Sequence, residues 1–250
     1  MSTRAITAGR PESARSSDGE RVTGHAYLAA MQVRASDRRA RRAFQDLVLR
    51  LAKPGSCIFD LGAGPGIDAQ RCAAAGRKVL VYDVDPLMCA ALQEHCSNEI
   101  ASGQVILYQG DYPAFLTQQI PLIRRQHTIG LVTANFAPLS LIDDLRGLFA
   151  ALHALTAPGA MLLASVLNPD YPGDWRYRWW WANRWTYLRQ GHFCIHGVHD
   201  NIHRRSCQTL AALARPYFTL HSVRGMPLIR RYGRGIPVLN RYLFALFARH

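Results

Sequence analysis

The chain has 250 residues, of which 49% are hydrophobic, and a formal net charge of +13. This composition excludes a wholly disordered chain, and the length supports one substantial core in one or two domains. The apolar runs all fall short of the ~18 residues that a membrane-spanning helix needs. The charge is uneven, because residues 171–250 carry 13 arginines against two acidic residues, a net charge of +11. We therefore expect an anionic partner for this part of the chain.

Cysteine usage and the N-terminal residues bear on the compartment. Six cysteines occur without a C-x-x-C pair, mostly in apolar contexts, which fits a reducing compartment better than a disulfide framework. The first residues lack the hydrophobic centre of a signal peptide. We therefore expect a cytoplasmic protein, with peripheral membrane association as a further option. Residues 1–22 are aperiodic and rich in Ser, Gly and Arg, which predicts a disordered tail.

Residues 23–52 are predicted to form a helical cap. Its later part repeats apolar side chains at helical spacing, at Phe44, Val48 and Leu51. A helix with one apolar stripe buries that stripe. The cap should therefore pack against a sheet formed by the residues that follow.

The segment from 57 to 83 carries the most informative pattern of the chain. An apolar strand ends at Asp60, glycines follow at positions 62, 64 and 66, and a helix is predicted over 68–75. A second apolar strand over 79–82 ends at Asp83. Such a unit places a ligand-binding turn at the carboxyl edge of a parallel sheet. Glycine permits positive φ and close approach of a ligand, and an acid about 20 residues further on suits ribose hydroxyls. The segment therefore predicts a nucleoside site.

The spacing of the glycines excludes a dinucleotide turn, because Ile67 occupies the third glycine position of G-x-G-x-x-G. The pattern from Asp60 to Gly66 is instead D-x-G-x-G-x-G. It resembles that of the class I S-adenosylmethionine-dependent methyltransferases, especially their small-molecule branch. Further motifs of that family follow in order: an acid two residues before D-P-L-M (83, then 85–88), G-D (110–111) and P-G (158–159). The resemblance covers residues 43–169.

The resemblance implies an α/β fold, a Rossmann-like doubly wound seven-stranded sheet with an antiparallel last strand. The pattern predicts further helices at 86–95, 143–155 and 206–214, and further strands at 105–108, 128–133, 161–167, 218–223 and 242–248. Residues 23–250 would form a single methyltransferase domain. It would comprise the cap over 23–52, a cofactor-binding core over 53–169, an acceptor-side insertion over 170–205 and a closing helix and strands over 206–250. Helices before the first strand close over the cofactor in that family, a role open to Tyr27 or equally to plain packing.

The resemblance also assigns the cofactor, S-adenosylmethionine, and its binding residues. These residues are Asp60, Gly62, Ala63, Gly64, Gly66, Asp83, Val84, Asp111, Tyr112, Thr133, Ala134 and Asn135. The acid of the first strand and the glycine turn would hold the methionine end, and the acid of the second strand would bind the ribose. Residues 84 and 111–112 would contact the adenine, and residues 133–135 would border the sulfonium and the acceptor. Two alternatives stay open: Asp83 as a capping acid, and Asp111 as part of an ordinary turn.

Four histidines lie between residues 192 and 203, and a hydroxyl acceptor would need a general base. Their spacing of i, i+4, i+7 and i+11 would suit one helical face and a metal site. Glycines at 191 and 197 interrupt such a helix, and Phe193 and Ile195 alternate as in a strand. We therefore favour an edge hairpin with solvated histidines over a metal site. His192 and His196 are the candidates for the catalytic base.

All five tryptophans lie between residues 175 and 185, interleaved with arginines. One interpretation is an aromatic lid over a flat acceptor, formed by Trp179, Trp180 and Trp181 with Arg178. Others are an interfacial membrane contact, packing against the N-terminal helices, and stacking on nucleic acid. The D/N-P-P-F/Y motif of nucleic-acid amino-methylating enzymes is absent, since residues 135–138 are N-F-A-P. Nucleic acid is therefore the least favoured partner.

These observations predict methyl transfer from S-adenosylmethionine to a small hydrophobic or aromatic acceptor, with oxygen as the favoured atom. An acidic carrier protein or an anionic membrane surface is a further candidate partner, given the basic C-terminal part. Two alternatives stay open. The net charge favours an RNA methyltransferase, and a non-catalytic accessory protein could retain the cofactor fold. The intact Asp60 and glycine turn favour the enzyme.

Overall fold

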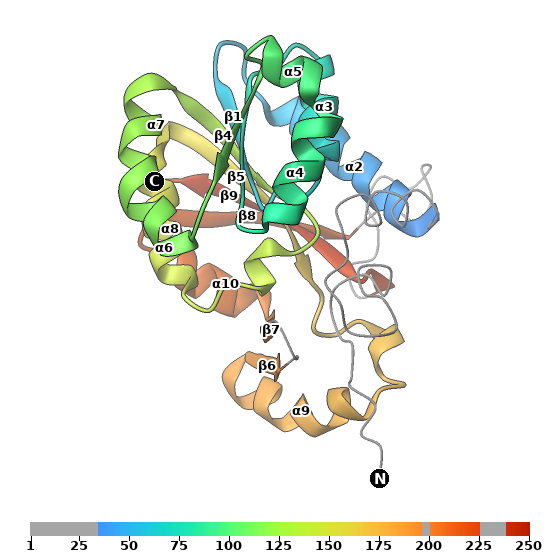
Figure 1. The fold of residues 1–250 in the computed structure, drawn as a ribbon. Coiled ribbons are helices and arrows are strands. Elements are labelled where there is room, and N and C mark those ends of the chain that lie inside the picture. Colours follow the sequence, from blue (N-terminus) through green and yellow to red (C-terminus); the bar gives the residue numbers. More distant parts are fainter. Residues whose placement is uncertain (1–34, 197–200, 226–238) are drawn as a thin grey trace.

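A computed structural model describes residues 35–196, 201–225 and 239–250 of the chain (Figure 1). The predicted tail over 1–22, the beginning of the cap with Tyr27, and His199 lie outside the described residues.

The core of the molecule is a seven-stranded sheet with the order β3-β2-β1-β4-β5-β9-β8. The strands β1 to β5 pair in parallel, whereas β9 is antiparallel to both of its neighbours, β5 and β8. Their bounds are Cys57–Leu61 (β1), Val79–Asp83 (β2), Val105–Gln109 (β3), Ile129–Ala134 (β4), Thr156–Leu167 (β5), Phe218–Gly225 (β8) and Tyr242–Arg249 (β9). The predicted Rossmann-like sheet with an antiparallel last strand is confirmed.

Helices cover both faces of this sheet (Figure 1). One face carries α2 (Ala35–Leu51), α3 (Ile67–Ala74), α4 (Pro86–His95) and α5 (Ser97–Ala101). The other carries α6 (Tyr112–Ala114), a π-helical turn (Phe115–Gln119), α7 (Ile120–Gln126), α8 (Leu145–Leu155) and α10 (Cys207–Ala214). Each face has its own apolar cluster between helices and strands. The sheet is therefore buried on both sides, as an all-parallel centre requires.

Local signals explain where several helices begin. The Asp85 side chain accepts a hydrogen bond from the Leu87 N–H, and Pro86 takes the first position of α4. Such N-caps satisfy backbone donors that the helix leaves unpaired. Helix α8 begins at Leu145, two residues after the predicted start, because Asp144 is its N-cap and accepts from the Gly147 N–H.

Strand β5 begins five residues before the predicted strand at 161. The Pro158–Gly159 turn lies within the strand as a bulge, where Gly159 has φ of +70° and the register with β4 shifts. A bulge of this kind lets a strand continue through residues that do not pair regularly.

The insertion after β5 forms a separate layer beyond the sheet (Figure 1). It holds a 3-10 turn (Pro172–Asp174), helix α9 (Arg178–Gln190), and strands β6 (His192–His196) and β7 (Asn201–Arg205), which pair antiparallel. The hairpin expected from the alternation of Phe193 and Ile195 is confirmed. The described ranges contain no group of three His, Cys, Asp or Glu residues that could hold a metal. They also contain no helix long and apolar enough to cross a membrane.

Candidate active site

Asp60 is the second-last residue of β1, in the middle of the sheet, and is 4% exposed. Its Oδ1 accepts a hydrogen bond of 2.7 Å from the Thr133 hydroxyl, on the neighbouring strand β4. Burial raises the pKa of the Asp60 carboxyl to about 7, with a further increase from Asp68, while Thr133 and Arg41 act in the opposite sense. A buried carboxylate without a paired cation favours a cationic ligand, because that charge would restore its ionised form.

The three glycines of the turn serve different purposes. A Cβ on Gly62 would meet Pro138 Cγ at 2.9 Å, and one on Gly66 would meet Cys96 Sγ at 2.8 Å. Gly64 has φ of +56°, and a Cβ there would have no atom within 4 Å. Gly62 and Gly66 therefore permit close packing inside the protein, and Gly64 faces open space where a ligand can approach the backbone.

Asp83 ends β2 and fixes this turn. Its Oδ2 accepts from the Gly64 N–H at 2.7 Å, and its Oδ1 accepts from the Asp85 N–H at 3.0 Å. A carboxylate oxygen can accept more than one hydrogen bond, so ribose hydroxyls could share this carboxylate with the backbone donors. Val84 follows with 56% of its surface exposed, although it is a large apolar residue beside a polar turn. This exposure suits the predicted contact with adenine.

A second carboxylate, Asp68 in the first turn of α3, was missed by the sequence analysis. It accepts from Arg41 Nη1 at 2.6 Å, Gln45 Nε2 at 2.7 Å and Asn135 Nδ2 at 2.9 Å. The Arg41–Asp68 ion pair is largely buried, with 12% and 11% of the side chains exposed. This network joins α2, α3 and the end of β4 around one side chain. The only sequence signal for it is the one-turn spacing of Arg41 and Gln45.

The chain turns sharply at the end of β4. Asn135 Oδ1 accepts from the Ser165 hydroxyl at 3.0 Å and from the Phe136 N–H at 2.9 Å. Phe136 and Ala137 then have φ of 60° and 68°, which is rare for residues with a Cβ. The Arg41 guanidinium lies 4.4 Å from the centre of the Phe136 ring. Strained backbone of this kind concentrates at ligand sites, where surrounding bonds hold it in place.

These parts enclose a cavity of about 30 Å³ at the carboxyl edge of the sheet. Its lining combines the glycine turn, two carboxylates, a guanidinium and an amide: Arg41, Asp60, Gly62, Ala63, Gly64, Pro65, Asp68 and Asn135. Such a set suits the end of a ligand that carries both a positive and a negative group.

Comparison with known proteins agrees with this geometry. The protein family described as "Methyltransferase domain" matches residues 36–205, more than half of the chain. The chain belongs to this methyltransferase family. The matched range begins in α2 and ends at the last residue of β7, so it includes the cavity and the insertion.

Individual relatives are more distant. The ribosomal protein L11 methyltransferase of Pelotomaculum thermopropionicum is 31% identical over 130 residues, which span 51% of this chain and only 37% of that protein. A solved S-adenosylmethionine-dependent methyltransferase of Mesorhizobium loti superposes with a TM-score of 0.54 at 18% identity, over 83% of this chain and 98% of that one. The Burkholderia thailandensis 1,6-didemethyltoxoflavin N1-methyltransferase, solved with its acceptor and S-adenosylhomocysteine, gives 0.56 at 18% identity, over 90% and 82%. The structural likeness shows the shared fold.

The predicted class is therefore confirmed: this is a class I methyltransferase, and S-adenosylmethionine is its cofactor. Three further predicted residues do not line the cavity. Ala134 is fully buried in the core, so it offers only backbone, while Asp111 is exposed after β3. Tyr112 packs against the cluster on the α7 and α8 face, and burial raises the pKa of its hydroxyl.

The tryptophans of the methyltransferase divide between two environments. Trp179 and Trp180 are 7% and 6% exposed and belong to an apolar group, here the aromatic cluster, formed by Ala137, Leu167, Trp179, Trp180, Phe193, Ile195, Ile202 and Tyr242. Trp181 and Arg178 are exposed on the outer side of α9. The four predicted acceptor residues therefore do not face a common space.

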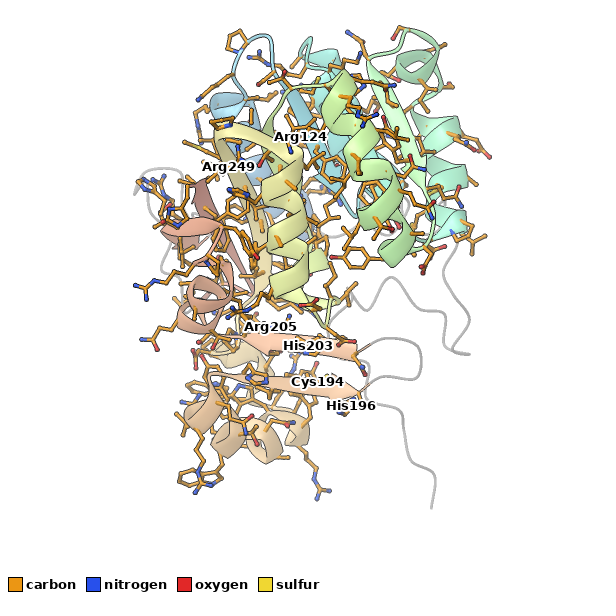
Figure 2. All side chains as sticks on the ribbon, turned by 90° about the vertical axis from the view of Figure 1, so that its left-hand side faces the viewer. Arg124, Cys194, His196, His203, Arg205 and Arg249 are labelled. Atoms are coloured by element: carbon orange, nitrogen blue, oxygen red, sulfur yellow. The ribbon has the colours of Figure 1, made fainter. Side chains whose placement is uncertain are left out.

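The hairpin histidines also lie away from the aromatic cluster. Side chains alternate along a strand, so His192, Cys194 and His196 share the face opposite Phe193 and Ile195. His196 lies at the connected end of the hairpin, opposite Asn201, and His203 lies opposite Cys194 (Figure 2). His196 Nδ1 is 3.0 Å from Asn201 Oδ1, and His203 Nε2 is 2.5 Å from Asp143 Oδ1. No cofactor-site residue contacts these imidazoles within the described chain.

Proposed function

We propose that this methyltransferase methylates a small aromatic or hydrophobic acceptor at oxygen. When bound, S-adenosylmethionine supplies an electrophilic methyl group on a sulfonium, and the protein contributes position and charge. The acceptor would lie against Phe136, between the cavity and the aromatic cluster. The position of this half-buried ring is the observation that carries the proposal.

The cofactor residues fit the chemical groups of S-adenosylmethionine. The buried carboxyl of Asp60 suits the ammonium group, and the Arg41 guanidinium suits the carboxylate of the methionine end, by charge-assisted hydrogen bonds. The open space at Gly64 admits the ligand to the backbone. Asp83 would hold the ribose, and Val84 would cover the adenine.

An apolar acceptor fits what surrounds Phe136. Its ring meets Tyr242 of the aromatic cluster edge-on, with centroids 5.3 Å apart, and Arg41 of the cavity on its face. Ala137 continues directly into the aromatic cluster. A flat acceptor placed here would contact large, fixed aromatic surfaces at little entropic cost.

Oxygen is favoured over nitrogen by the charges around this position. Arginines approach three aromatic rings: Arg41 lies at Phe136, Arg204 lies 5.5 Å from Trp179, and Arg241 lies 6.0 Å from Tyr242. Arg204 is also paired with Asp174. Arg41 and Arg204 share their charge with Asp68 and Asp174, so the preference for a phenolate or carboxylate rests on guanidinium N–H donors beside the rings.

The proposal can be tested by assaying purified protein with methyl-labelled S-adenosylmethionine against simple phenols, simple amines, total RNA and ribosomal protein. We expect label in the phenols, with the methylated atom identified by fragmentation in mass spectrometry. Phe136→Leu should raise the acceptor KM while cofactor affinity stays unchanged. Label in RNA or ribosomal protein alone would refute the small-molecule proposal. Label on amine nitrogen would refute the choice of atom and leave the acceptor class standing.

A further inference from the structure

Helix α9 presents an apolar stripe to the outside of the protein. Trp181, Trp185 and Leu188 are 60%, 72% and 57% exposed. Their spacing of i, i+4 and i+7 places them on one side of the helix. Trp175, just before the helix, is also 49% exposed. We call the surface of Trp181, Trp185 and Leu188 the outer face of α9.

The opposite side of the same helix already supplies its packing. Trp179 and Trp180 are buried in the aromatic cluster, and the Trp180 indole donates to the Pro169 carbonyl at 3.1 Å. Tyr187 donates to Asp170 Oδ2 at 2.8 Å. The helix is therefore fixed through its inner side. On the outer face, Trp181 donates to the Trp175 carbonyl at 2.7 Å, and the side chains of Trp185 and Leu188 are exposed.

The outer face is also positively charged. Arg178 and Arg189 are exposed beside the stripe at its two ends, and α9 contains no acidic residue. The acids described on the segment before α9 are paired with other arginines. Asp170 pairs with Arg184 at 3.0 Å, and Asp174 pairs with Arg204 at 2.9 Å. No acidic side chain on these described parts of the insertion offsets the two exposed arginines.

We propose that the outer face of α9 docks the protein on an anionic lipid bilayer. Tryptophan and arginine favour the layer between head groups and acyl chains, and a helix with an apolar stripe flanked by cations lies in the plane of that layer. Anionic lipids supply the charge that complements Arg178 and Arg189. Helix α9 also lies at the outer end of the molecule, beyond the hairpin and away from α7 (Figure 1). A projecting helix can reach a flat surface without hindrance from the sheet.

The chemistry of the face distinguishes a bilayer from single-stranded nucleic acid. Nucleic acid is bound in cationic grooves whose aromatic rings stack on bases. Here the stripe projects from the side of a helix and does not line a groove. Leu188, one of its three residues, has no ring that could stack on a base. The inference does not depend on which acceptor is methylated, since it concerns a surface remote from the cofactor cavity.

Vesicle co-sedimentation of the full-length protein tests the proposal. We expect partitioning to vesicles of phosphatidylglycerol and phosphatidylcholine, with much weaker binding to phosphatidylcholine alone. Binding should fall as ionic strength rises, because salt screens exposed charges over about 8 Å at physiological strength. Bound protein should show a blue shift of tryptophan emission that is reduced in Trp185→Phe.

Matched variants distinguish binding through the outer face of α9 from nonspecific binding to vesicles. Leu188→Ser and Arg189→Glu should each lower partitioning by about tenfold, the second mainly on anionic vesicles. The controls lie on α7, where Leu122 is 49% exposed and Arg125 is also exposed. Leu122→Ser and Arg125→Glu change hydrophobicity and net charge equally and should leave partitioning unchanged. These residues are on the surface, so all four variants should fold.

Several outcomes would overturn the proposal. The docking face is wrong if Leu188→Ser and Arg189→Glu bind vesicles as well as the controls do. It is also wrong if wild-type protein fails to bind anionic vesicles at low salt. If Leu188→Ser instead abolishes a dimer seen by analytical ultracentrifugation, or loosens the segment before residue 35 in hydrogen exchange, the face has a protein occupant. Loss of RNA binding without loss of vesicle binding would assign it to nucleic acid.

Discussion

The carboxyl group of Asp60 combines near-complete burial with a pKa of about 7. Its pKa in the folded protein lies above the value of about 3.8 expected when unfolded, so the folded state favours the protonated form. The stability that this group contributes is present below the unfolded pKa and is lost as pH rises through about 7. The chain thus keeps an ionisable carboxyl at a position where a neutral side chain would make the unliganded protein more stable. Such a loss of stability is common at functional sites.

Asp60→Asn should therefore stabilise the unliganded protein at pH 8 by roughly 1–3 kcal/mol and leave it nearly unchanged at pH 4. Urea unfolding at both pH values measures this difference. The same variant should bind S-adenosylmethionine more weakly, by roughly 1.5–3 kcal/mol for a lost charged hydrogen bond. Asp111→Asn, at an exposed carboxyl, is the control for stability and should show no gain at pH 8. Equal effects of both variants would show that burial of the Asp60 carboxyl does not lower the stability of the protein at pH 8.

The glycine turn allows a second test with single residues. Gly64→Ala should cost about 1–2 kcal/mol of stability, because φ of +56° is unfavourable for alanine, and should weaken cofactor binding at least about tenfold. Gly66→Ala should cost more, since its Cβ would also meet Cys96 Sγ at 2.8 Å. Gly55, with φ of +75° and open space around it, is the matched control. Gly55→Ala should lose similar stability to Gly64→Ala and bind the cofactor normally in calorimetry. Normal binding by Gly64→Ala would show that the ligand does not approach this backbone.

The sequence predicts the residues of the site that local spacing determines, and misses those that only the tertiary fold brings together. Asp60 and Asp83 each follow an apolar strand, so their place at the sheet edge follows from the pattern. Asp68 looks like an ordinary acid in the first turn of a helix. Arg41 lies within a basic run over 34–42, where periodicity cannot show which arginine turns inward. Their pairing depends on how α2 crosses α3, which no local signal specifies.

At the scale of elements, one buried ion pair joins two parts of the insertion, the 3-10 turn and β7, and its arginine also bonds to the end of β5. Arg204 of β7 is 1% exposed and contacts Asp174 Oδ2 at 2.9 Å and the Asn168 carbonyl at 2.9 Å. Asn168 itself follows β5, and Trp179 of α9 lies against the guanidinium. One side chain thus links the end of β5, the hairpin and α9. A buried pair is costly to break, because the remaining partner stays charged without compensation.

Arg204→Met should therefore destabilise the protein by about 3–5 kcal/mol, while the double variant Arg204→Met, Asp174→Leu should recover most of that loss. The comparison is the more exposed pair of Arg184 and Asp170, whose side chains are 32% and 45% exposed. Arg184→Met should cost about 1 kcal/mol or less. Denaturant unfolding of the wild type, Arg204→Met, Asp174→Leu and the double variant provides the cycle, with Arg184→Met measured beside it. A loss of under 1 kcal/mol in Arg204→Met would mean that packing, and not this pair, holds the insertion.

Alternation and turn residues predicted the hairpin of β6 and β7, but the sequence does not reveal which tryptophans of α9 face inward. The helix is apolar or aromatic on both sides, so hydrophobic periodicity has no single stripe to identify. Only the position of the aromatic cluster decides that Trp179 and Trp180 are buried and Trp185 is exposed.

At the scale of the whole molecule, charge is divided between the two functional ends. Residues 51–170 carry seven basic and ten acidic groups, whereas the residues after 170 carry a net charge of +11. Two of the acids, Asp60 and Asp68, lie beneath the glycine turn. The cofactor end thus attracts a cationic group, and the insertion attracts an anionic partner.

The carboxylates at the cofactor end predict which nucleoside cofactor stabilises the protein. S-adenosylmethionine at about 100 times its Kd should add about 2.7 kcal/mol to the free energy of unfolding. For a chain of this size, that corresponds to a rise in Tm of roughly 5–11 °C, measured by calorimetry or dye fluorescence. NAD at the same concentration should give no shift, for two physical reasons. First, the pyrophosphate of NAD would meet the carboxylates of Asp60 and Asp68 and not an anion-binding helix N-terminus. Second, Ile67 occupies the position of the third glycine that a dinucleotide turn needs.

The contrast between the two nucleosides can be sharpened with pH and a neutral analogue. S-adenosylhomocysteine lacks the sulfonium charge but keeps the ammonium group, so it should still raise Tm at pH 8. Its effect should weaken below pH 7, because the Asp60 carboxyl, with its pKa of about 7, is then protonated in the unliganded protein and must lose that proton to pair with the ammonium. Asp60→Asn should abolish this pH dependence while the Tm of the unliganded variant remains measurable. A shift by NAD equal to that of S-adenosylmethionine, or a shift that is the same at pH 6 and pH 8 in the wild type, would mean that the buried carboxylates do not select the ligand.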